Sequence, residues 1–474
     1  MYINGKWITG QDDIQVKNPA NGEVVGTVPR VGKEEVNEAI EAAYAAFKSW
    51  SKISAAERAS YMYKVAEIMR ARKDELARTA TLEMGKAFKD MLGEVQAAIN
   101  YVQWYAEEAQ RVYGEIVPSK ANKVVHVLKQ PIGVVGAITP WNFPVSMITR
   151  KISPAIAVGC TVVLKPSSSS PLSAKLIFEI FEEAGLPAGV VNLVLGNATE
   201  VSAALLENPK VKKMSFTGST EVGKALMAQA AKTVKKMSLE LGGHAPYIVF
   251  EDADLDLAVD QLVAGKFRCA GQTCVSMNRV YVQESIHDKF VDQLAQKVSR
   301  LKVGHGLDAE TNVGPLVNES GVRKVEEQVT DAVQKGAKVV VGGKRPQAEE
   351  LKNGSFYEPT VLTDVNESML ISHEETFGPV APIFTFKTEE EVIQKANDTQ
   401  YGLAAYFYTN DLSRGHRVAQ QLEFGIVGLN DSLPITASVP FGGIKESGFG
   451  KEGGHQGIDE YVIEKLVSTQ IKSS

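Results

Sequence analysis

The stretch TVVLKPSSSSPLSAKLIFEIFEEAGLPAGVVNLVL, residues 161–195, decides the fold. A short apolar run at Thr161–Leu164 predicts a strand, Leu172–Ala184 has a helix-like pattern, and Val190–Leu195 predicts a second strand. Strands that alternate with helices form a parallel sheet, because the helix returns the chain to the edge where it started. The stretch therefore predicts an α/β fold with helices on both faces of a parallel sheet.

The same alternation continues on both sides of this stretch. Apolar runs at Val134–Ile138 and Ala245–Phe250 predict further strands, Met214–Phe216 is a shorter candidate, and Glu200–Leu206 is helix-like. A second α/β series follows residue 252, with predicted strands at Arg279–Val282, Lys338–Val341, Ala381–Phe386 and Ile426–Leu429. Because ligands of such sheets bind beyond the carboxyl ends of the strands, the residues that follow these runs are candidates for a binding site.

The N-terminal part, the segment before residue 131 and the C-terminus differ from this pattern. Residues 36–50, 55–72 and 74–112 have apolar side chains at helical spacing. Lys123–Gln130 alternates as an exposed strand does, and the tail Tyr461–Ile471 is apolar and strand-like. An apolar terminal strand needs a neighbour, and a partner subunit is one candidate.

Composition narrows the class of protein. The 474 residues correspond to about three domains at roughly 150 residues each. A net charge of -6 argues against a nucleic-acid binder, and no apolar stretch approaches the roughly 20 residues of a membrane helix. Three cysteines do not resemble a disulfide framework and fit a reducing compartment, so we expect a cytoplasmic protein.

Cys274, in Gly271-Gln272-Thr273-Cys274, is the candidate nucleophile. A thiolate attacks strongly when its surroundings lower the pKa of the thiol. A lone cysteine can equally be a small buried hydrophobe. Glu240, flanked by Leu239 and Leu241, is a candidate general base, because an apolar pocket would raise its pKa. The alternative is a glutamate that closes a strand with a salt bridge.

Three polar segments follow predicted strands. Asn142, in Thr139-Pro140-Trp141-Asn142-Phe143-Pro144, is a candidate amide donor to an oxyanion, or else a turn residue that starts a helix. Gly218 and Ser219, in Phe216-Thr217-Gly218-Ser219-Thr220, could bind an anion through backbone N–H groups. Lys165 could bind a ribose or phosphate, or be merely solvated. The histidines lack metal-ligand spacing, so no metal is predicted.

In combination these motifs resemble the aldehyde dehydrogenase superfamily, over about residues 3 to 470. The segments that carry the resemblance are Pro140–Pro144, Lys165–Ser167, Phe216–Thr220, Glu240–Gly243, Gly271–Cys274, Glu375–Pro379 and Pro440–Gly443. The resemblance implies a Rossmann-type cofactor domain, an α/β catalytic domain and a bridging β-hairpin that assembles a homodimer or homotetramer. The expected boundaries are 1–118 with 139–251 for the cofactor domain, 252–445 for the catalytic domain, and 119–138 with 446–474 for the hairpin and tail.

The resemblance also implies roles for single residues. Cys274 would attack the aldehyde, Asn142 and the Cys274 backbone N–H would bind the oxyanion, and Glu240 would activate the water that hydrolyses the thioester. The cofactor would be NADP or NAD. Its expected contacts are Thr139, Pro140, Trp141, Lys165 at the adenosine ribose, Ser168, Gly218 and Ser219 at the pyrophosphate, Leu241, Glu375 at the nicotinamide ribose, and Phe377.

Within the superfamily the chain looks most like succinate-semialdehyde dehydrogenases. Arg150 and Arg268 occupy positions at which two arginines grip the substrate carboxylate in that group, and Thr436 stands near its usual serine. Both arginines could instead be ordinary salt-bridge partners. Lactaldehyde, glycolaldehyde and broad-specificity aldehyde dehydrogenases share much of the pattern and remain alternatives. Ser168 replaces a glutamate common in NAD-preferring relatives, which predicts use of NADP, alone or beside NAD.

Overall fold

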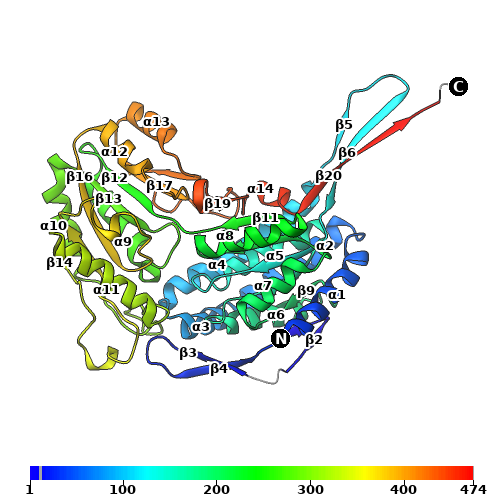
Figure 1. Cartoon of the computed structure of the whole chain (residues 1–474), viewed down its shortest axis with the longest axis horizontal. Coiled ribbons are helices and arrows are strands. Elements are labelled where there is room, and N and C mark those ends of the chain that lie inside the picture. The colour runs from blue at the N-terminus through cyan, green and yellow to red at the C-terminus, as the bar shows by residue number, and fades with distance from the viewer. Residues whose placement is uncertain (10–12, 473–474) are drawn as a thin grey trace.

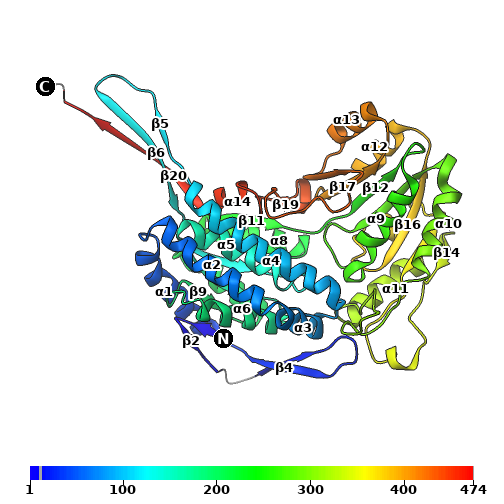
Figure 2. The same cartoon turned by 180° about the vertical axis from the view of Figure 1, so that it is seen from behind.

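The computed structural model describes residues 1–9 and 13–472 of the chain. It consists of two α/β units side by side, with a β-hairpin arm that projects away from the first unit (Figures 1 and 2). Residues 10–12 of the predicted cofactor domain and 473–474 of the predicted tail lie outside the described part. In the described ranges, no helix combines the length and the apolar character that crossing a membrane requires.

The first unit is built on an eight-stranded sheet in the order β19-β11-β10-β7-β8-β9-β1-β2. Its five central strands are parallel: β11 (Lys236–Glu240), β10 (Val211–Thr217), β7 (Val134–Ile138), β8 (Thr161–Lys165) and β9 (Val191–Leu193). Antiparallel strands β19 (Gly448–Phe449), β1 (Tyr2–Ile3) and β2 (Lys6–Trp7) form the two edges. The predicted parallel sheet is confirmed, and residues 161–195 form its central β8-α6-β9 unit.

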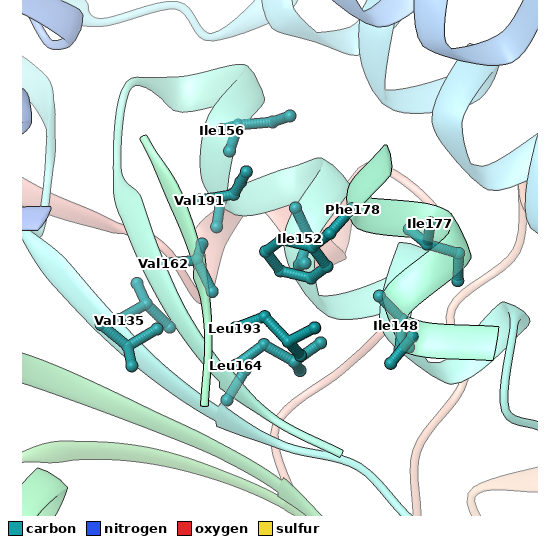
Figure 3. Close-up of a cluster of buried hydrophobic side chains, with 14 of the residues drawn as sticks. Val135, Ile148, Ile152, Ile156, Val162, Leu164, Ile177, Phe178, Val191 and Leu193 are labelled. Carbon is teal, nitrogen blue, oxygen red and sulfur yellow. The ribbon is translucent and has the colours of Figure 1, made fainter. Parts of the chain in front are cut away.

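Helices cover both faces of this sheet, as the pattern predicts. On one face lie α5 (Ser146–Val158) and α6 (Pro171–Glu183), backed by α2 (Ala55–Ala71), α3 (Lys73–Met84) and α4 (Phe88–Glu108). On the other face lie α1 (Lys33–Trp50), α7 (Ala198–Glu207) and α8 (Thr220–Ala230). Buried side chains of β7, β8 and β9, Val162 and Leu193 among them, form a core with Ile152 and Phe178 of α5 and α6 (Figure 3).

The prediction of one helical segment over residues 74–112 is wrong in its middle. The chain leaves α3 at Gly85, which has a φ of 88°, and enters α4 at Phe88. A Cβ on Gly85 would lie 2.4 Å from Cγ of Pro315 in the second unit, so only glycine fits this close approach. The short strands before α1, namely β1, β2, β3 (Asp13–Lys17) and β4 (Val24–Pro29), were also not predicted.

The second unit carries a seven-stranded sheet in the order β14-β15-β16-β13-β12-β17-β18. The strands are β12 (Ala245–Val249), β13 (Met277–Gln283), β14 (Lys338–Val341), β15 (Thr360–Thr363), β16 (Val380–Phe386), β17 (Ala404–Tyr408) and β18 (Ile426–Leu429). Its helices are α9 (Leu255–Phe267), α10 (His287–Val298), α11 (Glu319–Gln334), α12 (Glu389–Asn397) and α13 (Leu412–Gln421). All strands but β14 are parallel, which confirms the predicted second α/β series. Two details differ: β15 and β17 were not predicted, and β12, predicted as a strand of the first series, pairs with β13 and β17 in this sheet.

The projecting arm is a three-stranded sheet in the order β20-β6-β5. Its strands are β5 (Glu115–Val117), β6 (Lys123–Pro131) and β20 (Val462–Gln470), and the short helix α14 (Gln456–Asp459) precedes β20. β20 pairs antiparallel with β6 along its whole length. Both strands were predicted; the neighbour of the apolar tail is therefore β6 of the same chain.

The connection between the two sheets positions a site. Strand β11 ends at Glu240 and β12 begins at Ala245. This connection is only four residues long, 241–244, and it leads from the carboxyl edge of the first sheet to the amino edge of the second. Cys274 precedes β13 and Glu375 precedes β16, both at that amino edge. Residues that follow strands of the first unit therefore face residues that precede strands of the second.

Candidate active site

The first sheet reverses its winding between β7 and β10. These strands are neighbours, but the helices that follow them lie on opposite faces of the sheet, which opens a crevice at their carboxyl ends. A cavity of about 380 Å³ lies at this place. Its lining includes Pro140, Trp141 and Asn142 after β7, Thr217, Gly218 and Ser219 after β10, Leu241 and Gly242 after β11, and Cys274, Glu375 and Phe377 from the second unit.

The N-termini of the helices show where an anion could bind in this crevice. Glu94 of α4 accepts hydrogen bonds from the N–H groups of Val145 (2.9 Å) and Ser146 (3.2 Å) at the start of α5. Glu83 of α3 accepts from Leu172 (2.7 Å) and Ser173 (2.9 Å) at the start of α6. Because helix N-termini attract anions, the protein's own carboxylates already occupy these two. The N-terminus of α8, at Gly218 and Ser219, faces the cavity instead.

Polar groups in and beside this cavity fit a nicotinamide dinucleotide. Glu375 is half-buried and accepts a hydrogen bond from Gly243 N at 3.0 Å, and burial raises its pKa to about 7. The hydroxyls of Thr139, Thr217 and Thr376 are buried and have no hydrogen-bond partner within residues 1–9 and 13–472. Unpaired buried hydroxyls indicate a polar ligand, because such groups are usually satisfied.

Aromatic rings close one side of the cavity. Trp141 and Phe377 meet edge to face, with ring centroids 5.6 Å apart. Phe377 has a φ of 51°, a backbone conformation that side chains rarely adopt without functional or packing constraint. The pair gives the cavity an apolar wall next to the polar groups, as a nicotinamide ring requires.

Lys165 and Ser168 lie at the same sheet edge but not in the lining of this cavity. Lys165 ends β8 and is buried, its ammonium donates to Pro166 O at 3.2 Å, and burial lowers its pKa. Ser168 is exposed in the loop that follows. They stand two strands from the pyrophosphate candidates, since β7 lies between β10 and β8, and this position suits the far end of a dinucleotide.

Cys274 lies where two cavities meet. It is half-buried and lines both the 380 Å³ cavity and a second cavity of about 430 Å³. The loop that carries it is strained: Cys269 and Ala270 have φ values of 53° and 52°. A Cβ on Gly271 would lie 2.0 Å from Gly378 O, so this loop packs closely against the Glu375–Phe377 segment.

The surroundings keep Cys274 protonated in this state. Burial raises the pKa of its thiol to about 12, and the negative charges of Glu375 and Glu240 act in the same direction. The positive charge of Arg150 opposes them. Since the thiolate is the nucleophile, a change of local charge or a proton acceptor is needed before attack.

Asn142 is held beside the cysteine loop. Its side chain is buried, and Nδ2 donates to Gln272 O at 3.0 Å, two residues from Cys274. An amide nitrogen carries two hydrogens, so one remains for an oxygen bound at Cys274. The structure thus brings together two residues that are 132 positions apart in the chain (274 − 142).

Glu240 ends β11 as a buried carboxylate. Neither of its oxygens has a hydrogen-bond partner in the described part of the chain. Burial and the charge of Glu452 raise its pKa well above 4.5, and Arg150 and Lys151 offset this only in part. A Cβ on Gly442 would lie 2.9 Å from Oε1 of Glu240, so this glycine leaves the carboxylate its space. A carboxyl with a raised pKa suits general acid–base work.

Glu452 is a residue that sequence reasoning missed. Its carboxylate contacts Lys151 Nζ at 2.6 Å and Arg150 Nε at 3.0 Å, and all three side chains are buried. The Gly-rich run at 448–453 contains no local signal for such a role. Pairing of β19 with β11, with Gly448 opposite Glu240, brings the run into the site.

The 430 Å³ cavity is lined by all three predicted substrate residues, Arg150, Arg268 and Thr436. Arg268 forms no ion pair with any described residue, and its Nε is buried without a partner. Arg150 pairs with Glu452 through Nε and lies 4.0 Å from the ring centre of Phe441, but its Nη2 is also unpartnered. Arg268 is therefore the freer of the two guanidinium groups, and Arg150 is also a salt-bridge partner.

Other groups on this cavity carry charge or sulfur. Lys86, Lys89 and Asp90 line it, and so does Cys269, whose pKa is raised to about 11 by burial. Thr436 is exposed and its hydroxyl lies 3.0 Å from Ser438 Oγ. Within residues 1–9 and 13–472, no cluster of three or more His, Cys, Asp or Glu side chains could hold a metal ion.

Comparison with known proteins identifies the family to which this chain belongs. The sequence profile of the Aldehyde dehydrogenase family matches residues 7–467. Succinate-semialdehyde dehydrogenase, mitochondrial, from Arabidopsis thaliana is 52% identical over 468 residues, 98% of this chain and 88% of the relative. Glutarate-semialdehyde dehydrogenase from Pseudomonas aeruginosa is 51% identical over 464 residues, 97% of this chain and 95% of the relative. 3-sulfolactaldehyde dehydrogenase from Pseudomonas putida is 48% identical over 469 residues, 98% and 96% of the two chains.

Solved structures agree with the sequence comparison. The crystal structure of an E. coli NADP-dependent enzyme superposes with a TM-score of 0.97 at 50% identity, over 99% of this chain and 98% of that one. This similarity confirms the predicted fold. Because the family profile and the relatives both span nearly the whole chain, the protein belongs to the aldehyde dehydrogenase family and is an enzyme of aldehyde oxidation.

Proposed function

We propose that this enzyme oxidises succinate semialdehyde to succinate with NADP or NAD, through a thioester on Cys274. The observation that carries the proposal is the position of Cys274 between two cavities. One cavity has the donors and aromatic rings that suit a nicotinamide dinucleotide, and the other has the unpaired guanidinium of Arg268.

The proposed reaction uses three residues of the chain. Once the thiol proton has passed to water, Cys274 Sγ attacks the aldehyde carbon, and the resulting oxyanion accepts hydrogen bonds from Asn142 Nδ2 and Cys274 N. Glu375, Gly218 and Ser219, with Lys165 and Ser168 at the adenosine end, would hold a nicotinamide dinucleotide, which would accept the hydride that leaves the former aldehyde carbon. Glu240 then takes a proton from the water that attacks the thioester. Dividing one difficult step into two lower barriers is the gain of covalent catalysis.

The proposed substrate class rests on the negative charge that the aldehyde carries at its other end. The three relatives are named for succinate semialdehyde, glutarate semialdehyde and 3-sulfolactaldehyde, aldehydes that carry a carboxylate or sulfonate at the other end. A half-buried arginine without an ion-pair partner suits such an anionic group, because its planar fork binds two oxygens at once. Arg150 Nη2 and the Thr436 hydroxyl line the same cavity and would add donors.

Arg268→Ala tests the carboxylate grip. We expect KM for succinate semialdehyde to rise by about 10- to 100-fold, because a charge-assisted hydrogen bond is lost. KM for butanal, which has no carboxylate, should change by less than about threefold on the same reasoning. Steady-state kinetics with both aldehydes measure this, and Arg268→Lys serves as the charge-matched control. Equal effects of Arg268→Ala on the two substrates would refute the grip.

A panel of three aldehydes with two cofactors tests the proposed substrate and cofactor together. We expect kcat/KM for succinate semialdehyde to exceed that for lactaldehyde and for butanal by at least about tenfold, since only the first carries an anion. NADP should be used at least as well as NAD, because exposed Ser168 leaves room for a 2′-phosphate where a glutamate would repel it. A preference for lactaldehyde would favour the alternative substrate, and strict NAD use would contradict the role of Ser168.

We also propose the predicted domain division and a homodimer or homotetramer. The two sheets support a cofactor domain followed by a catalytic domain, but they divide at residues 241–244 and not near 251, because β12 belongs to the second sheet. The arm exposes large apolar side chains, with Ile116 78% and Leu466 68% exposed, and apolar surface of this kind is usually covered by a partner. Light scattering on the purified protein should give two or four chain masses; a single chain mass would contradict the assembly.

A cytoplasmic location remains our proposal for the compartment. All three cysteines, Cys160, Cys269 and Cys274, have free thiols, as a reducing compartment favours. Cell fractionation with an antibody against the chain would test this.

A further inference from the structure

A buried ion pair lies behind the turn that carries Asn142. Lys86 stands in the link between α3 and α4, Glu94 stands on α4, and their charged atoms are 2.5 Å apart. Each side chain is only 2% exposed. Taking two charges out of water costs several kcal/mol per ion, so such a pair by itself is weak evidence for a role in stability.

The pair holds both ends of the turn over residues 142–146. Lys86 Nζ donates to Asn142 O at 2.8 Å and lies 3.8 Å from the ring centre of Phe143. Glu94 Oε1 accepts from the N–H groups of Val145 and Ser146. The ammonium thus fixes the first residue of the turn, and the carboxylate fixes the last two.

The side chain of Asn142 is fixed from the opposite direction. Nδ2 donates to Gln272 O, and Gln272 in turn is tied to the second unit, because its Oε1 accepts from Val317 N at 2.9 Å and its Nε2 donates to Cys269 O at 3.0 Å. The amide is therefore clamped between the ion pair and the cysteine loop. If the turn shifted, the distance between the amide nitrogen and an oxygen bound at Cys274 would change directly.

We propose that Lys86 and Glu94 are positioning residues for the reaction: they act through the backbone of residues 142–146 to aim the Asn142 amide at the oxyanion. The inference rests on the proposed role of Asn142. Both residues also line the 430 Å³ cavity, but the proposed role is exerted on the backbone of the turn and not on the reacting atoms. A misplacement of about 1 Å at such a donor can cost about 100-fold in rate.

Glu83 is a matched control within the same unit. It is a buried glutamate that receives the N-terminus of a neighbouring helix, as Glu94 does, but its hydrogen bonds go to Leu172 and Ser173 at α6. Glu83→Gln and Glu94→Gln make the same substitution, although burial raises the pKa of Glu83 to about 8 and only Glu94 of the two is paired with Lys86. We expect both to lower thermal stability, whereas kcat at saturating cofactor should stay within about twofold for Glu83→Gln and fall about 10- to 100-fold for Glu94→Gln.

The double variant Lys86→Met/Glu94→Gln separates rate from folding. It leaves no unpaired buried charge, so its melting temperature should return toward that of the unchanged protein. The amide oxygen that replaces the Glu94 carboxylate can still accept from the start of α5, but Asn142 O loses its donor. We expect kcat for succinate semialdehyde to remain about 10- to 100-fold low, with KM changed by less than about threefold.

A double-mutant cycle with Asn142→Ala decides between positioning and general structure. Asn142→Ala alone should lower kcat about 100- to 1000-fold. Adding Glu94→Gln to it should cost less than about threefold more, because the donor to be aimed is already gone. Additive losses, or a kcat within about twofold for folded Lys86→Met/Glu94→Gln, would overturn the positioning role. A normal kcat for Asn142→Ala would instead overturn the proposed function.

Discussion

Cys274→Ala is expected to remove the dehydrogenase activity, with kcat for succinate semialdehyde falling by at least about 10⁴-fold. The reason is chemical: without the sulfur no thioester forms, and the two lower barriers become one high barrier. The rate of NADPH formation measures the loss. The expected drop is the largest for any single change in this enzyme.

Two controls keep this result interpretable. Titration of the variant with NADPH should still show binding, because Cys274 is one side chain in a lining made of many others. Cys160→Ser changes another buried thiol, which lies directly before β8 and whose Sγ donates to Tyr461 O at 3.3 Å. This change should leave kcat within about threefold, as a change remote from the site does. Turnover by folded Cys274→Ala that binds cofactor would end the assignment of the nucleophile.

Glu240→Gln is expected to have the second largest effect, a fall in kcat of about 10²- to 10⁴-fold, because general base catalysis of thioester hydrolysis is lost. Water attacks only in the second half-reaction, so the first half-reaction, which forms the thioester and NADPH, does not need this base. Mixing the variant rapidly with substrate and NADP should therefore give a burst of about one NADPH per site, followed by slow turnover. Absence of both burst and turnover, in a variant that folds and binds cofactor, would place Glu240 in the first half-reaction instead.

The pH dependence of kcat should identify the same carboxyl. Burial and the charge of Glu452 raise the pKa of Glu240 above 4.5, so the group is largely protonated at a pH where an ordinary glutamate is ionised. A base works only when deprotonated, so kcat should rise with pH through this raised pKa and level off above it. In Glu240→Gln that rise should vanish; a rise that persists unchanged would assign it to another group.

The folded units could be predicted from sequence because their signals are local. In β8, α6 and β9 each apolar residue lies within a few positions of the next, and the spacing alone distinguishes strand from helix. The break at residues 85–87 was not predictable. Gly85 ends α3 in a left-handed conformation with a φ of 88°, and Pro315, far along the chain, leaves no room there for a side chain. The helical periodicity on both sides of the break does not predict the contact between Gly85 and Pro315.

The sequence by itself determined the two α/β units, the strand character of the arm and the family, since periodicity and short motifs need no knowledge of distant neighbours. Only the tertiary structure decided how the site is assembled: that Cys274 separates two cavities, that Glu452 pairs with Lys151 across 301 positions, and that Lys86 and Glu94 clamp the Asn142 turn. Such contacts join residues that are far apart in the chain, so they depend on how helices pack within the first unit and on how the two units meet.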